Sequence, residues 1–352
     1  MLRARYAPYR LLFKEPSGTS RGVMTYKECY MLQLYDDALP EHVGWGECAL
    51  FRGLGSDDLP EYEAVLVEAC RQVSVKPFEE VLQQLAGWTS IRFGFETAWQ
   101  ELNGWRDYPS RFEEGEHPIT INGLVWMGDK ATMLRRIEEK LEAGFRCVKL
   151  KIGAIDFDAE LDLLRMVRSR FSRNEIELRV DANGAFSPAE ALGKLEALSR
   201  YDLHSIEQPI KAGQWEEMAR LCAHTPIPIA LDEELVACRQ VTPQLTAQLL
   251  DAIKPQYIIL KPSLTGAFTG SNEWIKAATE RGVGWWITSA LESNVGLAAI
   301  ARYTASLCTH SPQGLGTGAL YTNNIPSPLV QEGEVLTYNP QGEWQYPSMT
   351  WK

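Results

Sequence analysis

The sequence predicts an α/β fold in which a (β/α)₈ barrel carries an α+β capping domain, and two observations lead to this prediction. Short apolar runs that end in a charged residue recur every 25 to 30 residues across residues 148–261. That spacing is the length of one strand plus one helix, and repeated units of this kind form parallel sheets covered by their crossover helices. Residues 1–118 instead show strand patterns followed by helical patterns without alternation, which is typical of an α+β unit.

The capping domain is predicted to consist of residues 1–118, completed by residues 321–352. Three strands are expected at residues 6–13, 28–35 and 43–49, and helices after Pro60 and over residues 93–102, where apolar residues recur at three- and four-residue steps. The Gly- and Ser-containing stretch 14–25 is expected to be a mobile loop that can close over the barrel. The tail is rich in Pro and Gly and has no helical period, so we expect it to return to the cap.

The predicted barrel comprises residues 119–320. Residues 119–122 are expected to form its first strand and residues 130–142 the helix that follows. Ser187 and Glu190 form a capping-box pattern, with Pro188 at the first helical position, which predicts a helix start. The last units are predicted at residues 285–289 for strand seven, 294–306 for its helix and 314–316 for a short strand eight.

Composition limits the class of protein. The chain has 352 residues, of which 45% are hydrophobic, enough for a barrel and a second unit. A net charge of −11 argues against nucleic acid or an anionic membrane as partner. Seven scattered cysteines without a C-x-x-C pair are typical of reduced thiols. With no signal-peptide pattern and no membrane-spanning apolar run, we expect a cytoplasmic protein.

Acidic residues end three successive predicted strands. Asp181, Glu207 and Asp232 would therefore meet at the C-terminal mouth of the barrel, where barrels of this type hold their active sites. Each carboxylate alone is more typical of a helix cap or a surface ion pair. Three of them at this range repel one another unless a divalent cation lies between them. The group therefore predicts a metal site.

Three lysines frame these carboxylates in the sequence. Lys149 and Lys151 are two residues apart on predicted strand two, so both point to the same face. Lys261 ends predicted strand six, which lies opposite strand two in an eight-stranded ring. Cationic neighbours and a metal are expected to lower the pKa of such a lysine, which can then act as a general acid or base. Lys149 alone is as compatible with a structural or supporting role as with a catalytic one.

Other chemistries are disfavoured. The glycine-rich residues 314–318 are followed by a segment that cannot open a long helix, which argues against a dinucleotide site. The five histidines stand in no repeated relation to the carboxylates, and no nucleophile elbow is present.

The charged segments resemble the enolase superfamily and, within it, the muconate-lactonizing subgroup. The motifs that carry the resemblance are Lys149-Leu150-Lys151, Asp181-Ala182-Asn183, Glu207-Gln208-Pro209, Asp232-Glu233-Glu234 and Lys261-Pro262-Ser263, with Gly44-Trp45-Gly46-Glu47 in the cap. The resemblance covers essentially the whole chain. It implies that Asp181, Glu207 and Asp232 bind Mg²⁺, with Mn²⁺ as an alternative, and that the metal holds the carboxylate of a small-molecule substrate. It also implies that Lys151 removes the α-proton to give an enediolate.

Within the subgroup, residues 261–266, 288–296 and 314–318 look like the corresponding segments of the o-succinylbenzoate synthase family. This resemblance implies a syn-dehydration in menaquinone synthesis, in which Lys151 moves the proton and Lys261 stabilises the anion. Dipeptide epimerases usually carry a D-x-D motif on the last strand, which residues 316–319 lack. N-acylamino acid racemases share the same lysines and stay an alternative, as does a barrel that binds without catalysing. The oligomeric state is left open.

Overall fold

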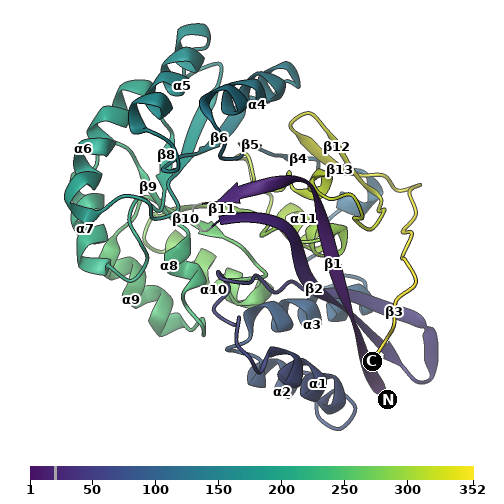
Figure 1. Cartoon of the computed structure of the whole chain (residues 1–352). Helices are drawn as coiled ribbons and strands as arrows, with labels where there is room; N and C mark the ends of the chain where they lie inside the picture. Colours follow the sequence, from purple (N-terminus) through teal and green to yellow (C-terminus); the bar gives the residue numbers. More distant parts are fainter. Residues whose placement is uncertain (20–21) are drawn as a thin grey trace.

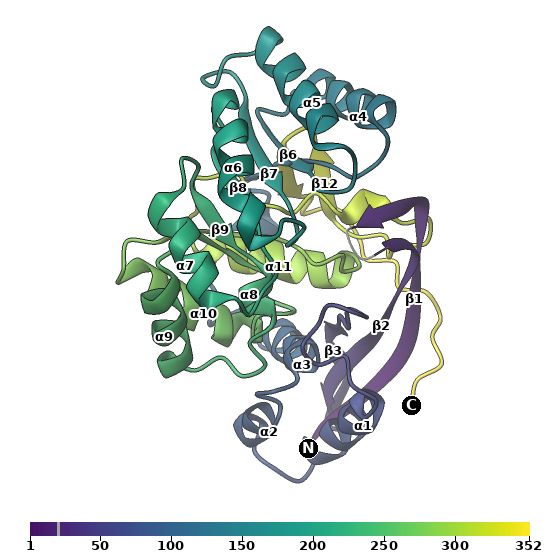
Figure 2. The same ribbon diagram turned by 60° about the vertical axis from the view of Figure 1, so that its left-hand side comes forward.

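The computed structural model describes residues 1–19 and 22–352. Figure 1 shows a barrel surrounded by helices, with a layered cap beside it that contains the purple N-terminal strands. Figures 1 and 2 show the long strands β1 (Leu2–Thr19) and β2 (Gly22–Asp36) running from the cap toward the barrel. The two ends of the chain meet on the cap, because Lys352 N donates to Tyr6 O at 2.8 Å. The predicted fold class, a TIM-like barrel with an α+β cap, is confirmed.

The cap has an antiparallel sheet backed by helices. The sheet order is β1-β2-β3, with β3 at Leu39–Cys48. The helices are α1 (Tyr62–Gln72), α2 (Phe78–Gln84) and α3 (Thr89–Leu102). β3 and α3 approach closely because both carry glycine, and a Cβ at Gly46 would come within 2.0 Å of Gly94 O. The three predicted strands and two predicted helices are present, whereas α2 was not predicted.

The loop predicted at residues 14–25 is wrong for most of its length. β1 and β2 continue through it as a hairpin, in which Ser17 pairs with Met24 and Gly18 with Val23. Residues 20–21 lie outside the described residues. The Gly and Ser composition suggested a loop, but pairing between the two strands, which no local pattern reveals, extends the sheet. The mobility of this stretch stays a prediction.

Seven parallel strands form the barrel wall in the described residues, in the order of the sequence. They are β5 (Gly123–Val125), β6 (Cys147–Lys151), β7 (Glu177–Asp181), β8 (Ser205–Glu207), β9 (Ile229–Leu231), β10 (Tyr257–Leu260) and β11 (Gly284–Ile287). Residues 313–314 close the ring, because Gly314 N donates to Ile287 O at 2.8 Å and Asn122 N donates to Gln313 O at 2.9 Å. The eighth strand is thus reduced to single bridges.

The first barrel strand lies later than predicted. The strand that pairs with β6 is β5, whereas residues 119–122 contribute β4 (Ile119–Thr120), which pairs antiparallel with β13. β13 (Val335–Tyr338) belongs to a hairpin with β12 (Leu329–Glu332), which was not predicted. The first residues of the predicted strand therefore pair with a strand that is distant in sequence and do not join the barrel sheet. The domain division at residues 118 and 320 stays a prediction.

Helices form the outer ring of the barrel (Figure 2). Ser187 and Glu190 form the predicted capping box. Apolar side chains from strands and helices make one large buried core. The described residues contain no helix with the length and apolar character needed to cross a membrane. The helices are α4 (Lys130–Glu142), α5 (Phe157–Arg170), α6 (Pro188–Leu198), α7 (Trp215–His224), α8 (Glu233–Val236), α9 (Pro243–Ile253), α10 (Ala267–Thr279) and α11 (Asn294–Ser306), with 3₁₀ turns η1 (Phe112–Glu114), η2 (Ser199–Tyr201) and η3 (Gly318–Leu320).

Candidate active site

Three carboxylates meet at the C-terminal ends of neighbouring strands. β7 ends at Asp181, β8 ends at Glu207, and Asp232 directly follows β9. Their ligand oxygens lie within 4.8 Å of one another, and all three side chains are buried. Because parallel strands place their carboxyl ends at one edge, residues about 25 apart in sequence become neighbours in space. The structure brings together the three residues predicted to bind metal.

The free oxygens of this group fit a divalent cation. Among the described residues, Glu207 Oε1 and Asp232 Oδ1 are buried without a hydrogen-bond partner. A buried polar atom of this kind is costly unless something binds it. Carboxylate oxygens are the ligands that Mg²⁺ and other hard cations prefer. The group can therefore hold a metal ion.

The local electrostatics also favour a cation. Burial raises the pKa of Glu207 to about 8; Lys149 opposes the rise, and the nearby Asp181 and Asp232 carboxylates add to it. Burial acts in the same direction on Asp181, but Lys151 and Lys149 outweigh it and hold the pKa of that carboxyl below its usual range. Negative charge is therefore crowded where three strands end, and a divalent ion would relieve the repulsion.

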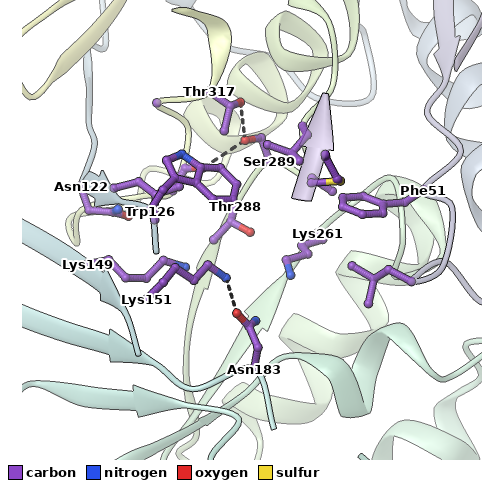
Figure 3. Close-up of a pocket in the computed structure, with 17 residues that line it drawn as sticks. Phe51, Asn122, Trp126, Lys149, Lys151, Asn183, Lys261, Thr288, Ser289 and Thr317 are labelled. Carbon is purple, nitrogen blue, oxygen red and sulfur yellow. Dashed lines mark hydrogen bonds between the residues drawn. The ribbon is translucent and has the colours of Figure 1, made fainter. Parts of the chain in front are cut away.

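The three lysines enter the same cavity from two sides. Lys149 Nζ donates to Glu207 Oε2 at 2.8 Å, and Lys151 Nζ donates to Asp181 Oδ2 at 2.6 Å. Lys261 Nζ donates to Asp232 Oδ2 at 2.5 Å. Figure 3 shows the two β6 lysines facing Lys261 across the cavity. Their opposed placement, predicted from strand order, is present in the structure.

The expected fall in lysine pKa is not produced by the protein groups themselves. Burial would lower the pKa of Lys149, but Glu207 and Asp181 outweigh it, and the pKa is raised. Burial would likewise lower the pKa of Lys261, but Asp232 outweighs this effect, so the pKa of Lys261 is also raised. Lys149 and Lys261 are therefore held as cations by the carboxylates that they face.

Asn183 joins the site although the sequence analysis gave it no role. Its Oδ1 accepts from Lys151 Nζ at 2.8 Å, and its Nδ2 donates to Glu233 Oε1 at 2.9 Å. The backbone φ of Asn183 is +45°, a conformation that Asn tolerates better than most residues. The sequence feature that could have indicated this role is the position of Asn183, two residues after Asp181, where a bend in the chain can place its side chain beside the strand end.

The cavity above the carboxylates is lined by residues from both the cap and the barrel. Apolar wall residues come from segments distant in sequence, while Ser289 Oγ and Thr317 Oγ1 form a hydroxyl pair at 2.6 Å (Figure 3). Most of these residues were not predicted, because residues such as Phe51 and Trp126 stand alone in irregular segments that show no period. The apolar side chains of the lining are Met24, Phe51, Leu54, Leu124, Trp126, Ala290 and Leu291.

Comparison with known proteins identifies the family of the chain. Residues 132–338 match the family model described as Enolase C-terminal domain-like. The chain is 46% identical, over 93% of its length, to the o-succinylbenzoate synthase of Desulfotalea psychrophila, of which 96% is covered. The chain belongs to the enolase superfamily. The predicted family is therefore confirmed.

Solved members of the enolase superfamily share the whole architecture. The crystal structure of MenC from Desulfotalea psychrophila matches with a TM-score of 0.78 and 43% identity, covering 96% of this chain and 99% of that one. A dipeptide epimerase from Cytophaga hutchinsonii, complexed with Mg and the dipeptide D-Ala-L-Val, matches with a TM-score of 0.84 but 19% identity, covering 99% and 97%. That second likeness shows the fold alone. The L-Ala-D/L-Glu epimerase of Bacillus subtilis is 25% identical over 81% of this chain and 79% of its own.

Proposed function

We propose that the chain is a Mg²⁺-dependent o-succinylbenzoate synthase. It would catalyse the syn-dehydration of 2-succinyl-6-hydroxy-2,4-cyclohexadiene-1-carboxylate to o-succinylbenzoate and water. The observation that carries the proposal is the placement of Lys151 and Lys261 on opposite sides of a cavity above three buried carboxylates. The 46% identity to a synthase supports this reaction over others of the superfamily.

Asp181, Glu207 and Asp232 would hold the metal, for which Mn²⁺ is an alternative to Mg²⁺. When bound there, the ion would hold the substrate carboxylate and offset the negative charge of the enediolate. The three carboxylates are buried, so the surrounding side chains hold them in place. Lys149, which donates to Glu207, would support this arrangement. Lys149 is therefore assigned a supporting role beside Lys151.

Lys151 would move the proton. In its neutral form, its Nζ takes the proton from C1 of the substrate, and the electrons of the C–H bond form the enediolate. These electrons then expel the C6 hydroxyl group on the same face. The proton on Lys151 Nζ goes to the departing oxygen, which leaves as water. The hydrogen bond that Lys151 Nζ donates to Asn183 Oδ1 would orient Nζ during both steps.

Lys261 would act by its charge. It lies on the opposite wall and is held as a cation by Asp232. Dehydration needs proton transfer on one face, so Lys261 would stabilise the enediolate without exchanging a proton. The apolar wall residues exclude water from the reacting carbons.

The test is product formation by the purified chain. Incubation with Mg²⁺ and the cyclohexadiene carboxylate is expected to give o-succinylbenzoate, identified by its ultraviolet spectrum and mass. Lack of product together with racemisation of N-acylamino acids would replace the proposal with a racemase. Lack of both would favour a binding protein. We also propose that the protein is cytoplasmic and that it acts in menaquinone synthesis.

A further inference from the structure

A buried cation lies behind the wall of the cavity that faces the cap. Lys27 on β2 is 5% exposed, and its Nζ donates to Ala290 O at 2.9 Å. The same Nζ lies 5.5 Å from the centroid of the Phe51 ring, within the range of a cation–π contact. One side chain therefore contacts two segments that are far apart in sequence.

Both contacted segments line the catalytic cavity. Phe51 and Ala290 are wall residues, and so is Met24, three residues before Lys27 on the same strand. A second hollow, lined by Lys27 and residues near it, shares Met24 and Phe51 with the cavity. Met24 and Phe51 thus separate the two spaces, and Lys27 lies on the outer side of this partition.

The segment that Lys27 contacts is fixed on its other side to the catalytic strand ends. Ala290 N donates to Glu292 Oε2 at 2.6 Å, and Glu292 Oε1 accepts from Ser263 Oγ at 2.5 Å. Ser263 is two residues after Lys261, and Glu292 and Ser263 are fully buried. Ala290 is therefore held between Lys27 of the cap and the segment that follows β10, so a change at Lys27 acts on the wall of the cavity.

Lys27 brings both a hydrogen bond and a charge to this wall. In the described part of the chain its hydrogen-bond acceptor is the Ala290 carbonyl. Its charge also acts on the buried Glu47 carboxylate, because burial raises the pKa of Glu47 and Lys27 opposes that rise. Glu47 accepts from Ser293 N at 2.9 Å, so the charge of Lys27 helps to hold the same wall segment. We propose that Lys27 is a positioning residue that fixes the wall formed by Met24, Phe51 and Ala290 and thereby sets the affinity for substrate. The identity of that substrate rests on the proposed function.

The kinetic test compares Lys27→Met with a matched control. Lys140 on α4 also lies over an aromatic ring, 5.1 Å from the Phe145 centroid, but outside the cavity, so Lys140→Met removes a similar contact elsewhere. With Mg²⁺ and the cyclohexadiene carboxylate, Lys27→Met is expected to raise KM at least about tenfold and to change kcat less than about threefold. Because Lys27 offsets the charge of the buried Glu47, both variants are assayed well below their thermal midpoints, and Lys140→Met should leave KM and kcat unchanged. An unchanged KM in folded Lys27→Met, or a fall in kcat as large as the rise in KM, would overturn the proposal.

A second measurement does not depend on the substrate. Hydrogen–deuterium exchange of the full chain is expected to show faster exchange in Lys27→Met confined to residues 50–54 and 289–292. Unchanged protection of these residues would contradict a positioning role. If the wild-type chain fails to convert the cyclohexadiene carboxylate, the proposed function falls, whereas the exchange result still decides whether Lys27 holds the wall.

Discussion

The floor and the cap-facing wall of the cavity are built in different ways. The floor consists of charged side chains at the ends of strands β6 to β10, whose positions are fixed by parallel pairing. The wall consists of mostly apolar side chains from β2 and from the segments after β3 and β11. Under the proposed function, the floor carries out the chemistry and the wall selects the substrate, so the two tasks lie in separate parts of the chain. Changes in the floor should lower kcat or metal affinity, and changes in the wall should raise KM.

The largest effect is expected in the floor, at Lys151. Lys151→Ala removes the group that takes the proton and should lower kcat by at least about 10⁴-fold, because loss of a general base adds to loss of positioning. Steady-state kinetics check the rate, and an unchanged thermal midpoint shows that the variant folds. Retention of activity within about tenfold would assign the proton transfer to another residue.

Two substitutions at Lys261 test whether this residue acts by its charge or as a second base. Lys261→Ala should lose about 10²- to 10³-fold in kcat, as for removal of a group that stabilises a developing anion. Lys261→Arg keeps the charge but cannot accept a proton near neutral pH, so it should retain more activity than Lys261→Ala.

Equal inactivity of the two Lys261 variants would indicate a base on each face, as racemisation requires. A second measurement uses N-acylamino acids of either hand in D₂O. A racemase would exchange the α-proton of both, whereas the proposed synthase is defined by turnover of the cyclohexadiene carboxylate.

Substitution of the three carboxylates proposed to bind metal should weaken Mg²⁺ binding, whereas substitution of a neighbouring carboxylate should not. Asp181→Asn, Glu207→Gln and Asp232→Asn should each weaken Mg²⁺ binding by more than about 100-fold, since even changes to residues around metal ligands cost about 10- to 100-fold. Titration calorimetry measures this affinity. Glu234→Gln is the control, because Glu234 accepts from Gly213 N at 3.0 Å and Trp215 Nε1 at 3.2 Å instead of joining the cluster. Equal weakening in the control would mean that the cluster is wrongly assigned.

The smallest effect is expected in the wall. Met24→Ala removes an apolar side chain from the cavity and should raise KM about tenfold with kcat nearly unchanged, as for lost contacts that bind substrate and transition state alike. Val23→Ala is a matched control on the same strand, because Val23 is 69% exposed and lies outside the cavity lining. If both variants behave alike, the hairpin has no part in substrate binding.

The difference between the floor and the wall of the cavity also explains which site residues could be predicted from the sequence. Asp181, Glu207, Asp232 and the lysines each end a short apolar run at nearly constant spacing, so strand order alone placed them together. Phe51 and Trp126 stand in irregular segments without periodicity, and their positions depend on packing between the cap and the barrel.

Strand pairing between distant segments could not be predicted from the sequence patterns either. The first barrel strand was misplaced because β13 pairs with β4. The composition of residues 14–25 predicts a loop, whereas pairing with the opposite strand of a hairpin makes most of this stretch part of the sheet. Local composition reports what one segment favours, and these two features are decided by partners elsewhere in the chain.

We propose that the three buried carboxylates hold the metal on which turnover depends. The most direct test follows formation of o-succinylbenzoate by the wild-type chain after treatment with EDTA and again after addition of Mg²⁺ or Mn²⁺. EDTA should abolish turnover and the added ion should restore it, because without a cation neither the crowded carboxylates nor the enediolate is neutralised. Full turnover in metal-free buffer would show that the reaction does not depend on a metal held by these carboxylates.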